Sequence, residues 1–209
     1  MRTKEYTIFA VLIAGAFLLG FFLFKNPPGK TAVSSGTLDH HGGTATVSIS
    51  NALLNSLVDK PLPDIILVDK DGNTTTTADL KGKAVVFFFN EGLMCYPACW
   101  NQVAGFGSDP RFNNGKIQAY SVLVDSAKDW QRAIDKMPEL AKAQTLFDTG
   151  TSASRQLGLL TLPSSMHRGS LPGHTYIVVD KDGIVRYVKD DPNMAMANNE
   201  IFNKIAEFK

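Results

Sequence analysis

Long apolar runs separated by helix-like stretches dominate the chain after residue 56. Residues 84–89 are continuously apolar, β-branched or aromatic, which is typical of a strand buried on both faces of a sheet. Residues 116–125 form a second such run. Each run is followed by a segment with helical spacing, at residues 95–106 and 126–137. The pattern predicts strands and helices in alternation.

Two further stretches have the pattern of hairpins. In residues 65–76 and 174–188, apolar β-branched runs flank an Asp-Gly turn. Residues 143–148 predict a short strand, residues 152–160 a short helix, and residues 198–209 a closing amphipathic helix. Together these elements predict one α/β domain over residues 56–209, in which helices cover a central mixed β-sheet.

The N-terminal part of the chain has a different pattern. Residues 6–24 are 19 residues without a charge, enough for a helix of about 28 Å, and they end in no small-residue cleavage site. They predict one transmembrane anchor, with residues 1–5 as a cytoplasmic head. Residues 25–55, rich in Pro, Gly, Ser and Thr, predict a flexible linker. The domain would then lie on the extracytoplasmic face of a cell membrane.

Overall charge excludes one class of partner. The chain has 21 Lys and Arg against 20 Asp and Glu, a net charge of +1. Nucleic-acid-binding domains concentrate positive charge, so nucleic acid is not an expected partner.

Candidate chemistry is concentrated in Cys95 and Cys99, the only two cysteines. They could form a structural disulfide, a redox couple or a soft-metal site. A disulfide over so short a loop stabilises little, which favours a functional pair. Residues four apart on a helix hold their Cβ atoms about 5–6 Å apart, and a relaxed disulfide needs about 3.5–4.5 Å. Cys95 must therefore bend out of the helix, or the bond is strained and easily reduced.

The two cysteines are expected to have different roles in exchange. At the N-terminus of the predicted helix, partial positive charge lowers a thiol pKa. We therefore predict Cys95 as the attacking thiol and Cys99, one turn later, as the resolving thiol.

The segments "LKGKAVVFFFN", "YSVLVD" and "LPGHTYIVVDKDGIVRYV", with the cysteine helix between the first two, resemble the thioredoxin-like superfamily. The likeness is to its redoxin, or AhpC/TSA, branch with membrane-tethered TlpA-like proteins, over residues 58–209. It implies a thioredoxin-like three-layer sandwich and a thiol–disulfide oxidoreductase without a bound cofactor, acting on thiol- or disulfide-bearing proteins outside the cytoplasm. It also implies a proline, typically cis, facing the redox cysteine, which Pro172 matches.

The chain departs from this resemblance in two ways. It has Cys-x-x-x-Cys where thioredoxins have Cys-x-x-Cys. Peroxiredoxins carry a proline seven residues and a threonine three residues before the reactive cysteine, and here those positions are Phe88 and Gly92. An antioxidant peroxidase therefore stays an alternative, with poor activity expected.

Another alternative is a copper chaperone. Cys-x-x-x-Cys followed by a late histidine is similar to Sco-type proteins, and Cys95, Cys99 and His174 would supply two thiolates and an imidazole, which suit Cu(I). Otherwise His174 would be a histidine at the rim of the pocket. Glu91 is predicted to be either an exposed loop carboxylate or a proton shuttle to Cys99.

Overall fold

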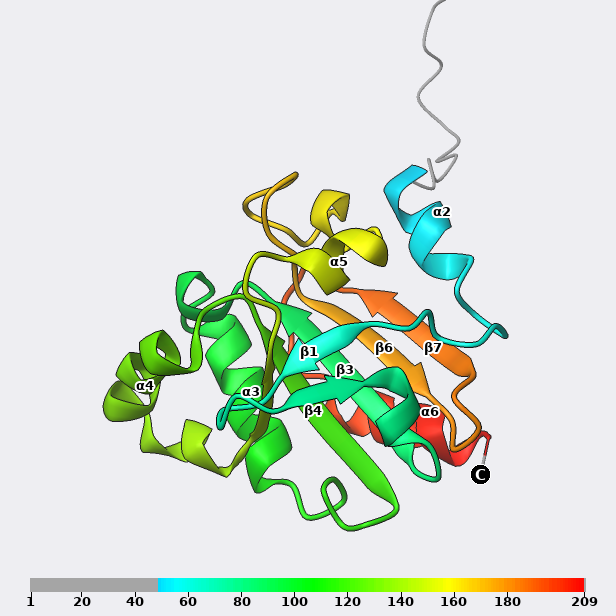
Figure 1. Cartoon of the computed structure of the whole chain (residues 1–209), viewed down its shortest axis with the longest axis horizontal. Helices are drawn as coiled ribbons and strands as arrows, with labels where there is room; N and C mark the ends of the chain where they lie inside the picture. Colours follow the sequence, from blue (N-terminus) through cyan, green and yellow to red (C-terminus); the bar gives the residue numbers. More distant parts are fainter. Residues whose placement is uncertain (1–48, 209) are drawn as a thin grey trace, which may run out of the picture. The chain divides into compact units, whose positions relative to one another are not determined.

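The apolar run at residues 84–89 forms the central strand, β3 (Ala84–Asn90), of a seven-stranded mixed sheet (Figure 1). The computed structural model describes residues 49–208. Strand β3 pairs in parallel with β4 on one side and antiparallel with β6 on the other. Six of its seven residues are buried, as expected of a strand covered on both faces.

The sheet order is β2-β1-β5-β4-β3-β6-β7, with β4 and β5 also parallel and the remaining pairs antiparallel. The other strands are β1 (Ile66–Val68), β2 (Thr74–Thr76), β4 (Ile117–Leu123), β5 (Gln144–Phe147), β6 (Thr175–Val179) and β7 (Val185–Asp190).

Helices cover both faces of this sheet. The α-helices are α2 (Ile49–Asn55), α3 (Ala98–Ser108), α4 (Ala127–Lys136), α5 (Ser152–Gln156) and α6 (Asn198–Ala206). The short 3₁₀ helices are η1 (Thr77–Leu80), η2 (Gly92–Met94), η3 (Pro138–Lys142) and η4 (Leu159–Thr161). Side chains alternate along β3, so Val86 and Phe88 pack with α3 and α6. Phe87 and Phe89 pack on the opposite face with residues of α2 and α5. The predicted α/β three-layer sandwich with a mixed sheet is confirmed.

Both predicted hairpins are present, and each turn is held by an aspartate. Asp69, at the end of β1, accepts the backbone N–H of Asn73 at 2.8 Å. Asp180, at the end of β6, accepts that of Ile184 at 3.0 Å. An aspartate side chain that accepts a hydrogen bond from the backbone a few residues later stabilises such a turn. For this reason the Asp-Gly pattern predicts a hairpin.

The predicted domain boundary at residue 56 is wrong. Residues 49–55, assigned to the linker, form α2, and Leu54 is 1% exposed within the core. The apolar pair Leu53–Leu54 gives only a weak helix signal, because Ser, Thr and Gly dominate the residues before it. No helix within residues 49–208 is long and apolar enough to cross a membrane. The predicted head (1–5), anchor (6–24) and most of the linker lie outside the described residues.

Candidate active site

The cysteine pair follows the carboxyl end of β3, where the chain passes through η2 before entering α3. The helix begins at Ala98, three residues later than predicted, so Cys95 lies in the turn before it and Cys99 is its second residue. Tyr96 precedes Pro97, and the ring of a proline disfavours helical geometry in the residue before it. The prediction of Cys95 as the first helical residue is therefore corrected.

Cys95 and Cys99 form a disulfide, with their Cα atoms 5.3 Å apart. That separation lies within the usual range for a disulfide. The sequence left two possibilities, a bent Cys95 or a strained bond, and Cys95 is indeed outside the helix, with φ −102° and ψ 45°. Both residues are buried, at 2% and 0% exposure, so burial of the oxidised pair does not separate their roles.

His174 lies directly against this disulfide. Its Nδ1 is 3.5 Å from the Sγ of Cys99, and its ring packs edge-on against Phe88 at 4.6 Å between centroids. His174 is fully buried just before β6, so the alternative of a rim histidine is wrong. Burial lowers the pKa of His174 to about 4, because an apolar pocket disfavours the charged imidazolium. At neutral pH the imidazole is uncharged.

The three residues predicted for the site are thus brought together. Donor atoms of Cys95, Cys99 and His174 lie within 4.8 Å of one another. In this oxidised state each sulfur is bonded to the other, and neither is a thiolate. The copper alternative stays a prediction that concerns the reduced protein.

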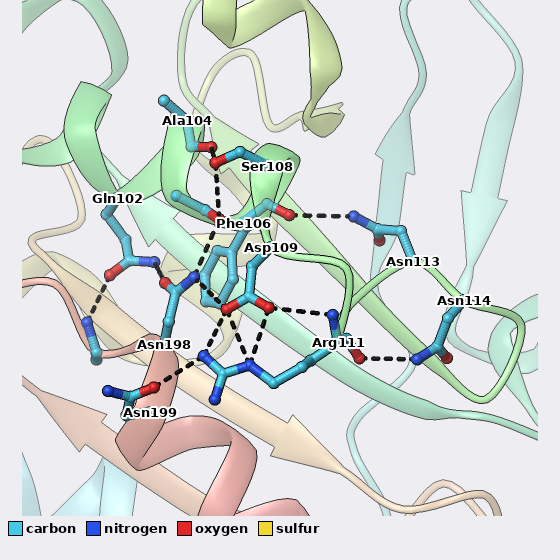
Figure 2. A network of polar contacts seen from close by, with 12 residues as sticks. Gln102, Ala104, Phe106, Ser108, Asp109, Arg111, Asn113, Asn114, Asn198 and Asn199 are labelled. Atoms are coloured by element: carbon cyan, nitrogen blue, oxygen red, sulfur yellow. Dashed lines mark hydrogen bonds and ion pairs between the residues drawn. The ribbon is translucent and has the colours of Figure 1, made fainter.

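Two residues that the sequence analysis missed extend the site inward. The Nε2 of His174 lies 2.7 Å from the hydroxyl of Tyr176, which donates to the Oε1 of Gln102 at 3.0 Å. The Gln102 amide in turn donates to Asn198 at 2.8 Å, and Figure 2 shows this amide pair beside Asp109. Two spacings could have revealed them: Tyr176 is two residues along the strand from His174, and Gln102 is three residues after Cys99 on the helix.

Asn198 also joins the site to a surface ion pair. Its side-chain amide donates to Asp109 at 3.0 Å, and Arg111 bonds the same carboxylate at 2.6 Å (Figure 2). The hydrogen bonds from Arg111 hold the pKa of Asp109 well below its usual range. The N-terminus of α6 is thereby fixed to the C-terminus of α3.

Glu91 is buried at 1% exposure, which corrects the expectation of an exposed loop carboxylate. Its Oε1 accepts the backbone N–H groups of Met166 and His167 at 2.7 and 3.1 Å, and its Oε2 lies 2.7 Å from the imidazole of His167. Glu91 therefore holds residues 165–167, from the loop ahead of His174, beside the cysteine turn. Within residues 49–208 the hydrogen bonds of the Glu91 carboxylate go to residues 165–167 and not to Cys99, so its role as a proton shuttle stays a prediction.

Comparison with known proteins adds the family. The model of the AhpC/TSA family matches residues 58–188, more than half of the chain. The chain belongs to the AhpC/TSA family. Among curated relatives of this AhpC/TSA chain, a chloroplastic peroxiredoxin Q of Triticum aestivum is 30% identical over 127 residues, 60% of this chain and 55% of the relative. One of Populus jackii is 26% identical over 154 residues, 71% of this chain and 69% of the relative. The first of these matches spans about half the length of the relative.

Solved structures show the same fold. The AhpC of Enterococcus faecalis superposes with a TM-score of 0.59 at 19% identity, over 72% of this chain and 91% of that one. Peroxidoxin BcpB of Mycobacterium tuberculosis gives 0.58 at 15% identity, over 73% and 97%. The thioredoxin-like fold that the resemblance implied is therefore present.

Two positions show how this AhpC/TSA chain departs from peroxiredoxins. Gly92 has φ +58°, and a Cβ atom there would overlap the carboxylate of Asp125, which accepts the N–H of Leu93 at 2.8 Å. No threonine fits at this position without displacing Asp125. Phe88 is fully buried in β3 and stacks on Tyr176 at 4.9 Å, so it belongs to the core. The surrounding structure therefore fits glycine at position 92 and phenylalanine at position 88.

Pro172 is buried two residues before His174. The resemblance implied a cis bond at this proline, but among residues 49–208 the cis peptide bond is Tyr96–Pro97. The cis expectation for Pro172 is wrong. Its assignment as a site residue stays a prediction.

Proposed function

We propose that the protein is a thiol–disulfide oxidoreductase in which Cys95 and Cys99 cycle between dithiol and disulfide. The observation that carries this proposal is the disulfide at the start of α3, with a neutral imidazole against Cys99. Membership of the AhpC/TSA family and relatives named peroxiredoxin support an oxidoreductase. In the proposed exchange the Cys95 thiolate of the reduced protein attacks one sulfur of a substrate disulfide, and the other substrate sulfur leaves as a thiolate with the bonding electron pair.

Cys95 is the proposed attacking thiol. The exposed side chains of Met94 and Tyr96 flank it, at 59% and 69% exposure, whereas Cys99 lies inward against His174. A partner chain would meet Cys95 first, and Pro172 would shape the groove in which that chain docks. Cys99 would be the resolving thiol.

Trapping of mixed disulfides tests these roles. With Cys99→Ser, the intermediate between Cys95 and a partner cannot resolve, so disulfide-linked partners should accumulate on non-reducing gels. With Cys95→Ser the same preparation should yield none. Equal trapping by both variants would contradict the assignment of Cys95 as the attacking thiol and Cys99 as the resolving thiol. No trapping by either variant would reject proteins as the substrate.

Peroxide is the competing oxidant, because the curated relatives are named peroxiredoxins. Gly92 and Phe88 argue against it, since neither can orient or activate a peroxide. Stopped-flow oxidation of the reduced protein by hydrogen peroxide should run at the rate of an ordinary accessible thiolate. A rate many orders of magnitude higher would establish the peroxidase instead.

Copper is tested on the same reduced protein. A competition titration with Cu(I) should show no more binding than the Cys95→Ser, Cys99→Ser double variant shows. Stoichiometric binding that is lost in the double variant would favour the chaperone alternative over thiol exchange.

The proposed site of action is outside the cytoplasm, with residues 6–24 as a single-pass anchor. The uncharged length of this segment supports it. Full-length protein should stay in the membrane pellet through carbonate washing, and the domain should be cleaved by protease added to spheroplasts. A soluble, processed form would contradict the anchor.

A further inference from the structure

A chain of buried hydrogen bonds leading to Cys99 begins at a donor whose direction is not in question. The backbone N–H of Ala197 donates to the Oε1 of Gln102 at 2.7 Å. The other end of the Gln102 amide donates to Asn198 at 2.8 Å (Figure 2). A backbone N–H can only donate, so the oxygen of Gln102 is the acceptor that faces Ala197 and Tyr176.

Tyr176 must therefore donate to Gln102. Its hydroxyl lies 3.0 Å from this oxygen and 3.5 Å from the carbonyl of Ala195, and both of these atoms are acceptors. Burial raises the pKa of Tyr176 well above its usual range, so the hydroxyl keeps its proton. With its own proton directed at an acceptor, the hydroxyl is left to accept a hydrogen bond from His174, 2.7 Å away.

This arrangement selects one tautomer of His174. The proton is on Nε2, which donates to Tyr176, and Nδ1 carries a free lone pair directed at the Sγ of Cys99. Three other groups also act on the ring: the buried Asp191 and a hydrogen bond to the backbone of Ala195 favour its protonation, and Lys189 opposes it. Burial outweighs them and keeps the ring neutral, so its Nδ1 has a lone pair that can accept a proton.

We propose that His174 is the base that takes the proton of the Cys99 thiol, and that Tyr176 and Gln102 are positioning residues that lock the tautomer required for it. This role deepens the proposed thiol–disulfide exchange and rests on it. The exchange leaves Cys95 in a mixed disulfide with a substrate sulfur and Cys99 as a thiol. The buried location of Cys99 would by itself disfavour its thiolate, so a neighbouring base is needed.

The Cys99 proton moves to Nδ1 of His174, and the thiolate attacks the Sγ of Cys95. The Cys95–Cys99 bond forms, the bond from Cys95 to the substrate sulfur breaks, and that sulfur leaves with the electron pair as a thiolate. The imidazolium then gives its proton to the leaving thiolate or to water. Protons do not travel beyond Tyr176, because the Gln102 oxygen only accepts.

The rate at which the Cys95–Cys99 disulfide closes can be measured without knowing the natural substrate. Reduced protein is mixed with 4,4′-dithiodipyridine, an aromatic disulfide: attack by Cys95 releases one thiopyridone, and closure by Cys99 releases the second. With His174 as the base, the closure rate should vary little between pH 5 and 8. In His174→Ala, closure should be about 100-fold slower at pH 7 and should rise about tenfold per pH unit, because only the thiolate already present can react.

Tyr176→Phe keeps the ring volume and removes only the hydroxyl that holds the tautomer. Closure should slow about fivefold, the value of one neutral hydrogen bond, while the protein stays folded. Tyr120→Phe is the matched control, because Tyr120 packs on the opposite face of the sheet against Phe87, so this variant should close at the wild-type rate. Cys99→Ser should release a single thiopyridone.

A second readout follows the proton directly. In reduced protein with ¹⁵N-labelled histidine, the His174 signals should show a bare Nδ1 and a protonated Nε2, and Tyr176→Phe should populate the other tautomer. A protonated Nδ1 in the wild type, or unchanged closure at every pH in both variants, overturns the inference. Should trapping find no protein partner while closure depends on His174 as described, the proposed substrate fails and the role of His174 stands.

Discussion

Replacing Glu91 with alanine is expected to destabilise the fold at the candidate active site more than any single change at an exposed carboxylate would. Glu91 is 1% exposed, and its Oε1 accepts the N–H groups of Met166 and His167 as well as the hydroxyl of Ser165 at 3.2 Å. Alanine would leave the N–H of Met166 without a partner. The N–H of His167 would keep only the Ser165 oxygen at 3.2 Å, and the Ser165 hydroxyl only the carbonyl of Leu171 at 2.9 Å. This segment lies between η4 and β6.

The magnitude follows from counting the donors that lose a partner. An unsatisfied buried N–H costs about 1–3 kcal/mol, and the low end applies because Met166 and His167 are reachable by water. The imidazole of His167 is 42% exposed, so its contact with Glu91 adds less than about 1 kcal/mol. Together these give about 3 kcal/mol. For a domain of this size that corresponds to a fall in Tm of about 6–12 °C.

Urea unfolding followed by circular dichroism measures this change, provided the slope with denaturant stays equal to that of the wild type. Glu91→Gln keeps an oxygen acceptor and should lose about 1 kcal/mol. Glu139→Ala, on the exposed surface of η3, is the matched control and should lose less than about 0.5 kcal/mol. If Glu91→Ala is as stable as Glu139→Ala, the anchoring role of Glu91 is refuted.

Three further outcomes are expected. Gly92→Thr should lower Tm and bring no gain in peroxide reactivity by stopped-flow, because its side chain displaces Asp125; a gain would contradict the steric argument. Gly173→Ala should also lower Tm, since a Cβ there would overlap Ser164, and an unchanged melting curve would show that the loop yields freely. As pH falls from about 6.5 to 4, His174 becomes protonated in the unfolded state but stays neutral in the folded state, because burial lowers its pKa to about 4. The free energy of unfolding should therefore fall by up to about 3 kcal/mol over this range. A His174→Gln variant should lack most of this loss when its unfolding free energy is measured at pH 6.5, 5 and 4.

Sequence alone was enough where the signal is local. The apolar run of β3 and the aspartate turns at Asp69 and Asp180 reflect burial and turn chemistry within a few residues, and the structure has both. The short spacing between Cys95 and Cys99 also indicated a functional pair. Contacts between distant segments could not be predicted in this way: Glu91 and His167 are 76 residues apart, and only the folded sheet brings them together.

The same limit applies to the inner part of the site. Gln102 and Tyr176 are 74 residues apart. From the sequence, Gln102 looks like an ordinary residue of an amphipathic helix and Tyr176 like one of a buried strand. The start of α3 was misplaced for a different reason. The apolar spacing runs through Pro97, and only the restriction that a proline imposes on the residue before it moves the first turn to Ala98.

Helix α2 decides where a shortened version of this protein has to start. A truncation at residue 56, which the composition of residues 25–55 suggests, would remove Leu54 from the apolar cluster that also contains Leu157 and would expose part of that cluster. Full burial of a leucine stabilises a fold by about 1.5–3 kcal/mol, and the uncovered patch would favour aggregation. A truncation that begins ahead of Ile49 retains the helix and should remain soluble at higher concentration than one beginning at residue 56.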